Sequence, residues 1–233
     1  IKGIGHIAYD KLVLNGHNIG ERILIMIAKE GVSYILAALC VAFIVCLVFG
    51  PLWGMLPGIL CLFLIFFFRN PDRSIVCDER NVLSPADGKI MSIEECYEGK
   101  FLNETGVKIT IFLSIFDVHV NRSPVKGEIM YQEYCCGRFQ PAYRKSVGQE
   151  NERHALGIEN GRVRVLVTQI AGALARRIIS SVTLGTELEQ GQVYGMIKFG
   201  SSTEIVVPKG VEVLVTKGDY VKAWITVLGK FVD

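Results

Sequence analysis

The chain has little net charge and few histidines. Its 233 residues carry 25 Lys and Arg against 23 Asp and Glu, a formal net charge of +2, and include 4 histidines. No basic run is interleaved with aromatic residues, so no nucleic-acid partner is expected. Charge alone does not identify a partner, although single arginines could meet lipid phosphates.

The 7 cysteines lack both a disulfide framework and the paired spacing of a zinc site. Cys40, Cys46 and Cys61 fall in an apolar stretch, where a thiol behaves as a small hydrophobic group. Cys135 and Cys136 are adjacent and cannot both reach one metal from a regular strand. We therefore expect no metal, and the odd cysteine count suits a reducing, cytosolic environment.

One long segment lacks charge altogether, because the 38 residues 31–68 contain no charged side chain. As a single helix it would be roughly 57 Å long against a hydrocarbon core of about 30 Å, so it is expected to break. Gly50-Pro51 and Pro57-Gly58 are the candidate breakers, which predicts a helical hairpin with arms near 32–49 and 52–68. The second arm is short for a full span, so a re-entrant hairpin is the alternative.

Basic residues flank this segment on both sides, with Lys29 before it and Arg69 and Arg73 after it. Both ends are therefore expected on the cytoplasmic side of the cell membrane. Residues 1–30 are expected to be an amphipathic interfacial segment, or the lead-in to the first arm. The remainder, 69–233, is expected to be the catalytic domain.

Helical periodicity is scarce beyond Asn81, and 172–179 is the best short candidate for a helix. Short runs of alternating β-branched residues predict strands at 107–113, 162–167, 204–208 and 211–215. The last 30 residues resemble the turn-rich strands of a biotinyl or lipoyl carrier barrel. The sequence thus predicts a β-dominated sandwich or barrel with an N-terminal α-helical membrane hairpin.

A Gly-Ser pair at Gly200 and Ser201 opens a strand-like run 33 residues before the end. Glycine leaves its carbonyl carbon unshielded, so Ser201 could attack the preceding peptide bond if a base were supplied. Such pairs are more often turns or bulges.

Two further segments supply a base and a carboxylate, His119 in VHVNR and Asp87 in SPADGK. Histidine can take a serine proton near neutral pH, and a carboxylate can fix the imidazole tautomer. Asp117 is also close in sequence, but it is expected to point away from His119, so Asp87 is preferred as the orienting group.

These motifs resemble the phosphatidylserine decarboxylase family in its short bacterial and archaeal form. The likeness covers nearly everything after about residue 20. It runs through FFRNPDR (67–73), SPADGK (84–89), VHVNR (118–122), NER (151–153), QIAG (169–172) and GMIKFGS (195–201). Several spaced motifs in one order are far more specific than any one of them.

The resemblance implies a self-processing carboxy-lyase. Ser201 would attack the Gly200 carbonyl, and elimination and hydrolysis of the resulting ester would leave a pyruvoyl group at position 201. The proenzyme would divide into residues 1–200 and 201–233, held together by packing. The pyruvoyl ketone would form a Schiff base with the headgroup amine of phosphatidylserine and accept electrons as CO₂ leaves, without pyridoxal phosphate, giving the ethanolamine lipid. Archaetidylserine is an equally good substrate chemically.

The resemblance has one informative departure and leaves some points open. Long-form members carry a second histidine where this chain has Phe116, so the proton donor in decarboxylation stays unassigned. Arg122, three residues after His119, is our candidate for binding the headgroup phosphate.

Two other functions use the same features: a membrane-tethered serine hydrolase or peptidase with Asp87, His119 and Ser201, and a noncatalytic, carrier-like scaffold. The expected partners are the phospholipid, the bilayer and the chain's own cleavage product. Whether the chain also forms a homo-oligomer is left open.

Overall fold

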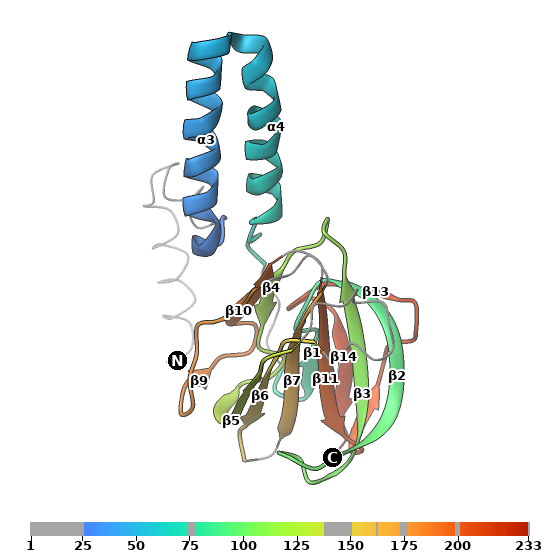
Figure 1. Cartoon of the computed structure of the whole chain (residues 1–233). Coiled ribbons are helices and arrows are strands. Elements are labelled where there is room, and N and C mark those ends of the chain that lie inside the picture. The colour runs from blue at the N-terminus through green and yellow to red at the C-terminus, as the bar shows by residue number, and fades with distance from the viewer. Residues whose placement is uncertain are drawn as a thin grey trace, which may run out of the picture. The chain divides into compact units, whose positions relative to one another are not determined.

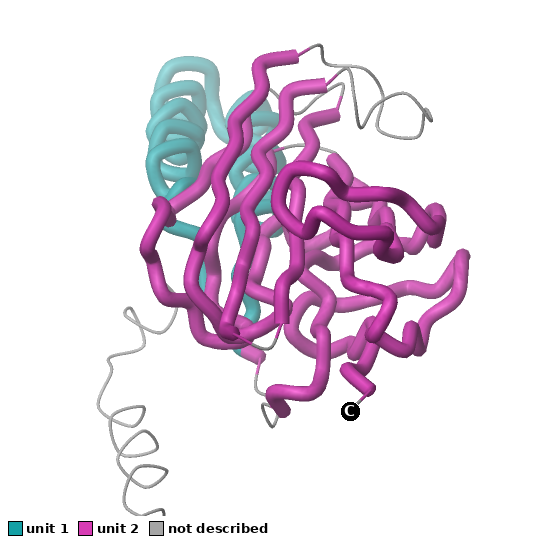
Figure 2. The backbone as a smooth tube through the Cα atoms, turned by 90° about the horizontal axis from the view of Figure 1, so that it is seen from below, with its two compact units in different colours: residues 1–72 teal, residues 73–233 magenta. Residues whose placement is uncertain are grey.

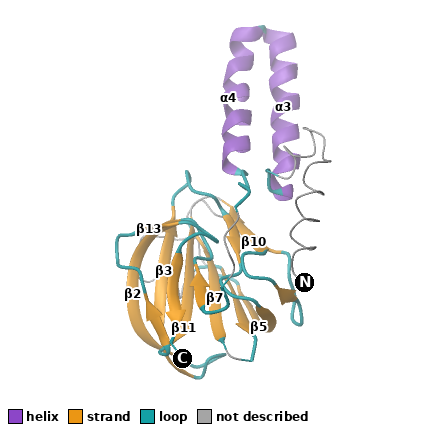
Figure 3. Ribbon diagram, turned by 180° about the vertical axis from the view of Figure 1, so that it is seen from behind, coloured by secondary structure: helices purple, strands orange, loops and turns teal. Residues whose placement is uncertain are grey.

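A computed structural model describes residues 26–73, 78–137, 151–161, 163–172, 177–198 and 201–232. The chain divides into two compact units, residues 1–72 and residues 73–233 (Figure 2). Within the described residues, the first unit holds helices and the second holds strands (Figures 1 and 3). This confirms the predicted β-dominated domain with an N-terminal helical hairpin. The amphipathic segment expected at 1–30 lies almost entirely outside the described residues.

Two apolar helices form the hairpin, α3 (Lys29–Phe49) and α4 (Pro51–Phe67). Gly50 makes the turn between them with φ of 90°, a conformation that glycine adopts without steric penalty. The predicted second breaker is wrong, because Pro57 lies inside α4. Proline lacks the N–H for one main-chain hydrogen bond of the helix, and the packing of α4 along α3 compensates for that loss.

A short β-bridge between Ile27 and Arg69 closes the open end of the hairpin. The Ala28 N–H donates to the Phe68 carbonyl at 2.8 Å, and the Asn70 N–H donates to the Met26 carbonyl at 2.6 Å. The two ends of the hairpin are therefore tied together. Of the described helices, α3 alone has the length and composition to cross a membrane, which is consistent with membrane association.

The second unit is built on an antiparallel sheet with the strand order β13-β2-β3-β11-β7-β6-β5-β9 (Figure 1). Its strands are β2 (Gly88–Glu98), β3 (Glu104–Leu113), β5 (Gly127–Cys135), β6 (Arg153–Glu159), β7 (Arg164–Ala171), β9 (Glu187–Leu188), β11 (Ser201–Pro208) and β13 (Tyr220–Val221). The sheet is strongly curved, and β11 lies near its middle (Figures 1 and 3).

Two smaller sheets complete the domain, with the orders β1-β14-β12 and β4-β10-β8. Their strands are β1 (Asn81–Leu83), β14 (Val227–Phe231), β12 (Val211–Val213), β4 (Val120–Arg122), β10 (Val193–Lys198) and β8 (Arg177–Ser180). The helix expected at 172–179 is not found in its described part. There, β-branched Ile178 and Ile179 pair with β10 instead.

The core lies against one face of the large sheet, where alternate residues of each strand point inward. Ile205 and Val207 of β11 meet Ile109 and Ile111 of β3 in this core. The structure explains why SPADGK has glycine at position 88. Gly88 has φ of 152°, and a Cβ there would lie 2.1 Å from the Phe112 carbonyl oxygen. This close contact fixes the SPADGK segment against β3.

Candidate active site

Ser201 is the first residue of β11 and is fully buried. It pairs with Leu113 of β3 on one side and with Ala171 of β7 on the other. Its hydroxyl has no hydrogen-bond partner among the residues that the structure describes. An unpaired buried polar group costs about 1–3 kcal/mol, so it calls for a functional explanation. Gly200, the other half of the predicted cleavage bond, lies outside the described residues.

His119 lies between a turn and β4, with its side chain fully buried. Its Nδ1 atom is 2.9 Å from the main-chain carbonyl oxygen of Asp117. A carbonyl oxygen only accepts hydrogen bonds, so in the neutral ring Nδ1 carries the hydrogen and Nε2 keeps the basic lone pair. Nε2 is therefore the nitrogen that can take a proton from a serine.

The segments that carry His119 and Ser201 lie against each other. The Asn121 amide donates to the Thr203 hydroxyl at 3.1 Å, and the Ile197 N–H donates to the His119 carbonyl at 3.2 Å. Asn121 is two residues after His119. Thr203 is two residues after Ser201 on β11, where that spacing keeps the two side chains on one face of the strand. The structure thus brings the predicted base and nucleophile into one region of the core.

The carboxylate of Asp87 is buried, but its hydrogen bonds go to residues other than His119. Arg73 donates from Nη1 to Oδ1 at 2.6 Å and from Nη2 to Oδ2 at 2.7 Å. The Ala223 N–H donates to Oδ1 at 2.8 Å, and Arg73 also donates to the Ala223 carbonyl at 2.8 Å. The role of Asp87 in orienting His119 stays a prediction, and Arg73 is a partner that sequence reasoning missed.

Asp117 contacts His119 through its main chain. The segment is a turn rather than a strand, so strand alternation does not set the direction of the Asp117 side chain. The contact uses the main-chain carbonyl of Asp117. Its carboxylate accepts a hydrogen bond from the Ser114 N–H at 2.8 Å, which closes the turn that leads to His119.

Arg122 is engaged with other groups on β4. The Arg122 guanidinium donates to the Gly191 carbonyl at 3.0 Å and lies over the Trp224 ring, 5.1 Å from its centroid. These contacts explain the half-buried position of Arg122 without a lipid, so its headgroup-binding role stays a prediction.

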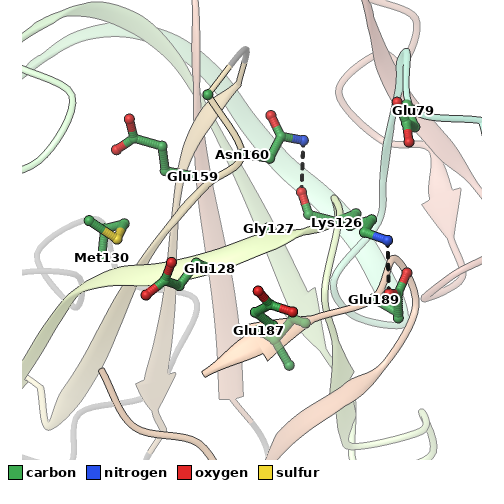
Figure 4. Close-up of a pocket in the computed structure, with 11 residues that line it drawn as sticks. Glu79, Lys126, Gly127, Glu128, Met130, Glu159, Asn160, Glu187 and Glu189 are labelled. Carbon is green, nitrogen blue, oxygen red and sulfur yellow. Dashed lines mark hydrogen bonds and ion pairs between the residues drawn. The ribbon is translucent and has the colours of Figure 1, made fainter. Parts of the chain in front are cut away.

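A pocket of about 520 Å³ elsewhere in the domain does not include these residues. Figure 4 shows its acidic lining, which comprises Glu79, Glu128, Glu159, Glu187 and Glu189, with Lys126 as the one labelled cation. Lys126 is paired with Glu189 at 2.9 Å. Such a lining repels an anionic headgroup, so this pocket is not a candidate lipid site. No group of three or more described His, Cys, Asp or Glu residues is arranged to hold a metal ion.

Comparison with known proteins gives one consistent result. The sequence profile of the phosphatidylserine decarboxylase family matches residues 60–228. A phosphatidylserine decarboxylase proenzyme of Carboxydothermus hydrogenoformans is 52% identical over 178 residues, which are 76% of this chain and 84% of that protein. Proenzymes of the same name from Symbiobacterium thermophilum and Aromatoleum aromaticum are 45% and 40% identical, each over 88% of this chain and 95% of the relative.

Proposed function

Because the chain belongs to the phosphatidylserine decarboxylase family, whose members are proenzymes with a serine-derived pyruvoyl group, we propose that Ser201 is the serine that is converted. The chain is a carboxy-lyase that converts phosphatidylserine to phosphatidylethanolamine and CO₂. The buried Ser201 hydroxyl, which has no hydrogen-bond partner among the described residues, carries the assignment. A hydroxyl that is lost during maturation needs no partner in the mature enzyme.

Self-cleavage exchanges a peptide bond for an ester and then breaks the ester. Ser201 Oγ attacks the Gly200 carbonyl carbon, a base takes its proton, and the amide nitrogen of residue 201 leaves and is protonated. Elimination then removes the Cα hydrogen of residue 201 as a proton, forms a Cα=Cβ double bond and breaks the Cβ–Oγ bond, so the serine oxygen departs in the new carboxylate of Gly200. Hydrolysis of the remaining enamine releases ammonia and leaves the ketone at position 201.

His119 is our candidate for the base that takes the Ser201 proton. Its tautomer supports this role, because the Asp117 carbonyl holds the hydrogen on Nδ1 and leaves Nε2 to accept. Asp87 remains the proposed orienting group, and its ion pair with Arg73 fixes the SPADGK segment that carries it.

The surroundings of position 201 also suit the family's prosthetic group. When bound there, a pyruvoyl ketone supplies an electron sink for the bond that releases CO₂. The chain itself contributes a dry site, because the neighbouring Leu113 and Ala171 are fully buried. Exclusion of water strengthens the electrostatic interactions of the reacting groups.

The proenzyme is cleaved into two chains, which we assign to residues 1–200 and 201–233. Strand pairing supports their staying together, since β11 lies between β3 and β7, β13 pairs with β2, and β14 pairs with β1. Ile205 and Val207 are fully buried in the shared core, and each such side chain stabilises by about 1.5–3 kcal/mol.

We further propose that the hairpin anchors the protein in the cell membrane with both ends on the cytoplasmic side. The basic residues Lys29 and Arg69 near its two ends and the β-bridge that joins them support this. In a cysteine-free background, probes at Gly20→Cys and Ile75→Cys should be labelled from the same side. Labelling from opposite sides would refute the hairpin.

Intact mass under denaturing conditions tests the Ser201 assignment. The wild-type chain should give two chains, and the smaller should weigh one ammonia less than residues 201–233. Ser201→Ala should remain one chain. If the Ser201→Ala variant still splits at this bond, an external protease is responsible and the assignment fails.

A further inference from the structure

A line of hydrogen-bonded polar side chains crosses the domain and ends at Thr203, two residues from Ser201 on β11. It consists of Gln132 on β5, His154 on β6, Gln169 on β7, Asn121 on β4 and Thr203 on β11. Apart from Gln132, none of these residues is more than 3% exposed. Buried polar groups are tolerated in a core when they form hydrogen bonds with one another, and these side chains do so.

The hydrogen bonds of the line all run in one direction. Gln132 Nε2 donates to His154 Nε2 at 2.9 Å, which leaves the ring hydrogen on Nδ1, 3.4 Å from Gln169 Oε1. Gln169 Nε2 donates to Asn121 Oδ1 at 2.9 Å, and Asn121 Nδ2 donates to Thr203 Oγ1 at 3.1 Å. Burial lowers the pKa of His154, which keeps its ring in the neutral form that this pattern needs.

Thr203 couples this line to the strand that carries the nucleophile. Thr203 and Ser201 are two residues apart on β11, so their side chains share a face. Thr203 also pairs directly with Gln169 across the β11 and β7 ladder. The beginning of β11 is therefore held in two ways, by its main-chain pairing with β7 and by the Asn121 side chain of β4.

We propose that this line is a positioning network that holds Ser201 in the geometry needed to attack its own preceding peptide bond. The inference rests on the proposed function of Ser201. Intramolecular attack depends steeply on the approach of the reacting atoms, which must come within about 3–3.5 Å in the right direction. Asn121, Gln169 and Thr203 act through β11 and need not touch the reacting atoms.

Two substitutions at Thr203 distinguish the effect of its hydroxyl on cleavage from the effect of its side-chain volume. Thr203→Val keeps the volume but removes the acceptor for the Asn121 amide, whereas Thr203→Ser keeps a hydroxyl. We measure the first-order rate at which freshly made proenzyme splits, by intact mass, and the thermal midpoint of each variant. Thr203→Val should slow cleavage at least tenfold, and Thr203→Ser should stay within about threefold of wild type.

A double-mutant cycle tests whether the residues act as one line. Gln169→Leu alone should also slow cleavage at least tenfold, and its combination with Thr203→Val should be little slower than either single variant. Gln190→Leu is the matched control, because Gln190 is a buried glutamine that donates to the Asn81 carbonyl at 2.8 Å outside this line. It should lower the thermal midpoint but leave the cleavage rate unchanged.

The outcomes distinguish the two levels of the proposal. A wild-type chain that never splits refutes the Ser201 assignment itself. If the wild type splits, then cleavage of folded Thr203→Val at the wild-type rate overturns only the positioning network. Multiplicative slowing in the double variant, or equal slowing by Gln190→Leu, overturns it as well.

Discussion

Replacement of Arg73 by glutamine should destabilise the β domain strongly, because it would leave the Asp87 carboxylate buried without its cation. The side chains of the pair are 9% and 7% exposed, and Arg73 donates from Nη1 to Oδ1 and from Nη2 to Oδ2 of Asp87. Removal of one partner from a buried ion pair typically costs about 3–5 kcal/mol. The Ala223 N–H still donates to Asp87, so we expect a loss near the lower end, about 3 kcal/mol.

Urea unfolding in detergent micelles measures this loss. A Ser201→Ala background keeps the chain in one piece, and Trp53→Phe leaves Trp224, next to Ala223, as the fluorescent reporter. Lys100→Gln serves as the control, because the side chains of the Lys100 and Glu133 pair are 53% and 33% exposed. An exposed pair contributes at most about 1 kcal/mol, so the control should change the unfolding free energy little.

The buried charge of Asp87 also determines how a second substitution behaves. Asp87→Asn added to Arg73→Gln removes the stranded charge, so the double variant should be more stable than Arg73→Gln alone. If Arg73→Gln lowers the free energy of unfolding no more than Lys100→Gln does, or if the double variant is the least stable of the set, the Arg73–Asp87 ion pair does not stabilise the β domain.

Three further outcomes follow from the site. His119→Ala and Asp87→Asn should both accumulate proenzyme on denaturing gels, and normal maturation of both would remove the proposed triad. Arg122→Gln should mature normally yet bind lipid in mixed micelles more weakly by about 1.5–3 kcal/mol if a charged hydrogen bond is lost, whereas unchanged affinity would leave Arg122 only its contacts with Gly191 and Trp224. Burial lowers the pKa of His154, so the unfolded chain binds this proton first, and the free energy of unfolding should fall as pH drops below about 6.5. His154→Gln should make the free energy of unfolding depend less on pH in this range. Urea unfolding at several pH values measures this dependence, and a slope equal to that of the wild type would contradict the role of His154.

The hairpin was predictable because its signal is long and local. No arrangement of 38 uncharged residues as one straight helix fits a bilayer, so a break was required. The position of that break was not fully predictable. Gly50 turns the chain because it adopts positive φ, whereas Pro57 is carried within α4 by packing against α3. A helix-breaking residue therefore adds a local energetic cost, and tertiary contacts determine whether the helix ends there.

The choice of Ser201 as the candidate nucleophile was open to sequence reasoning, because the GMIKFGS motif follows the other family motifs in order, whereas a Gly-Ser pair alone is more often a turn or bulge. The partner of Asp87 was not. Arg73 is 14 residues away and Ala223 is 136 residues away, and no periodicity connects them. Long-range polar contacts of this kind depend on the topology of the sheets. The same reason hides the line from His154 to Thr203, whose members come from different strands in two sheets.

The sheet topology is compatible with the proposed cut between residues 200 and 201. β10 belongs to the sheet with β4 and β8, whereas β11 belongs to the large sheet, so the proposed cleavage falls between ladders and interrupts neither. After cleavage, β11 keeps its pairing with β3 from Ser202 to Pro208 and with β7 from Ser202 to Val206. The proposed new chain end at residue 201 would therefore stay at the start of β11, and the strand that carries it would need no covalent link to remain in place.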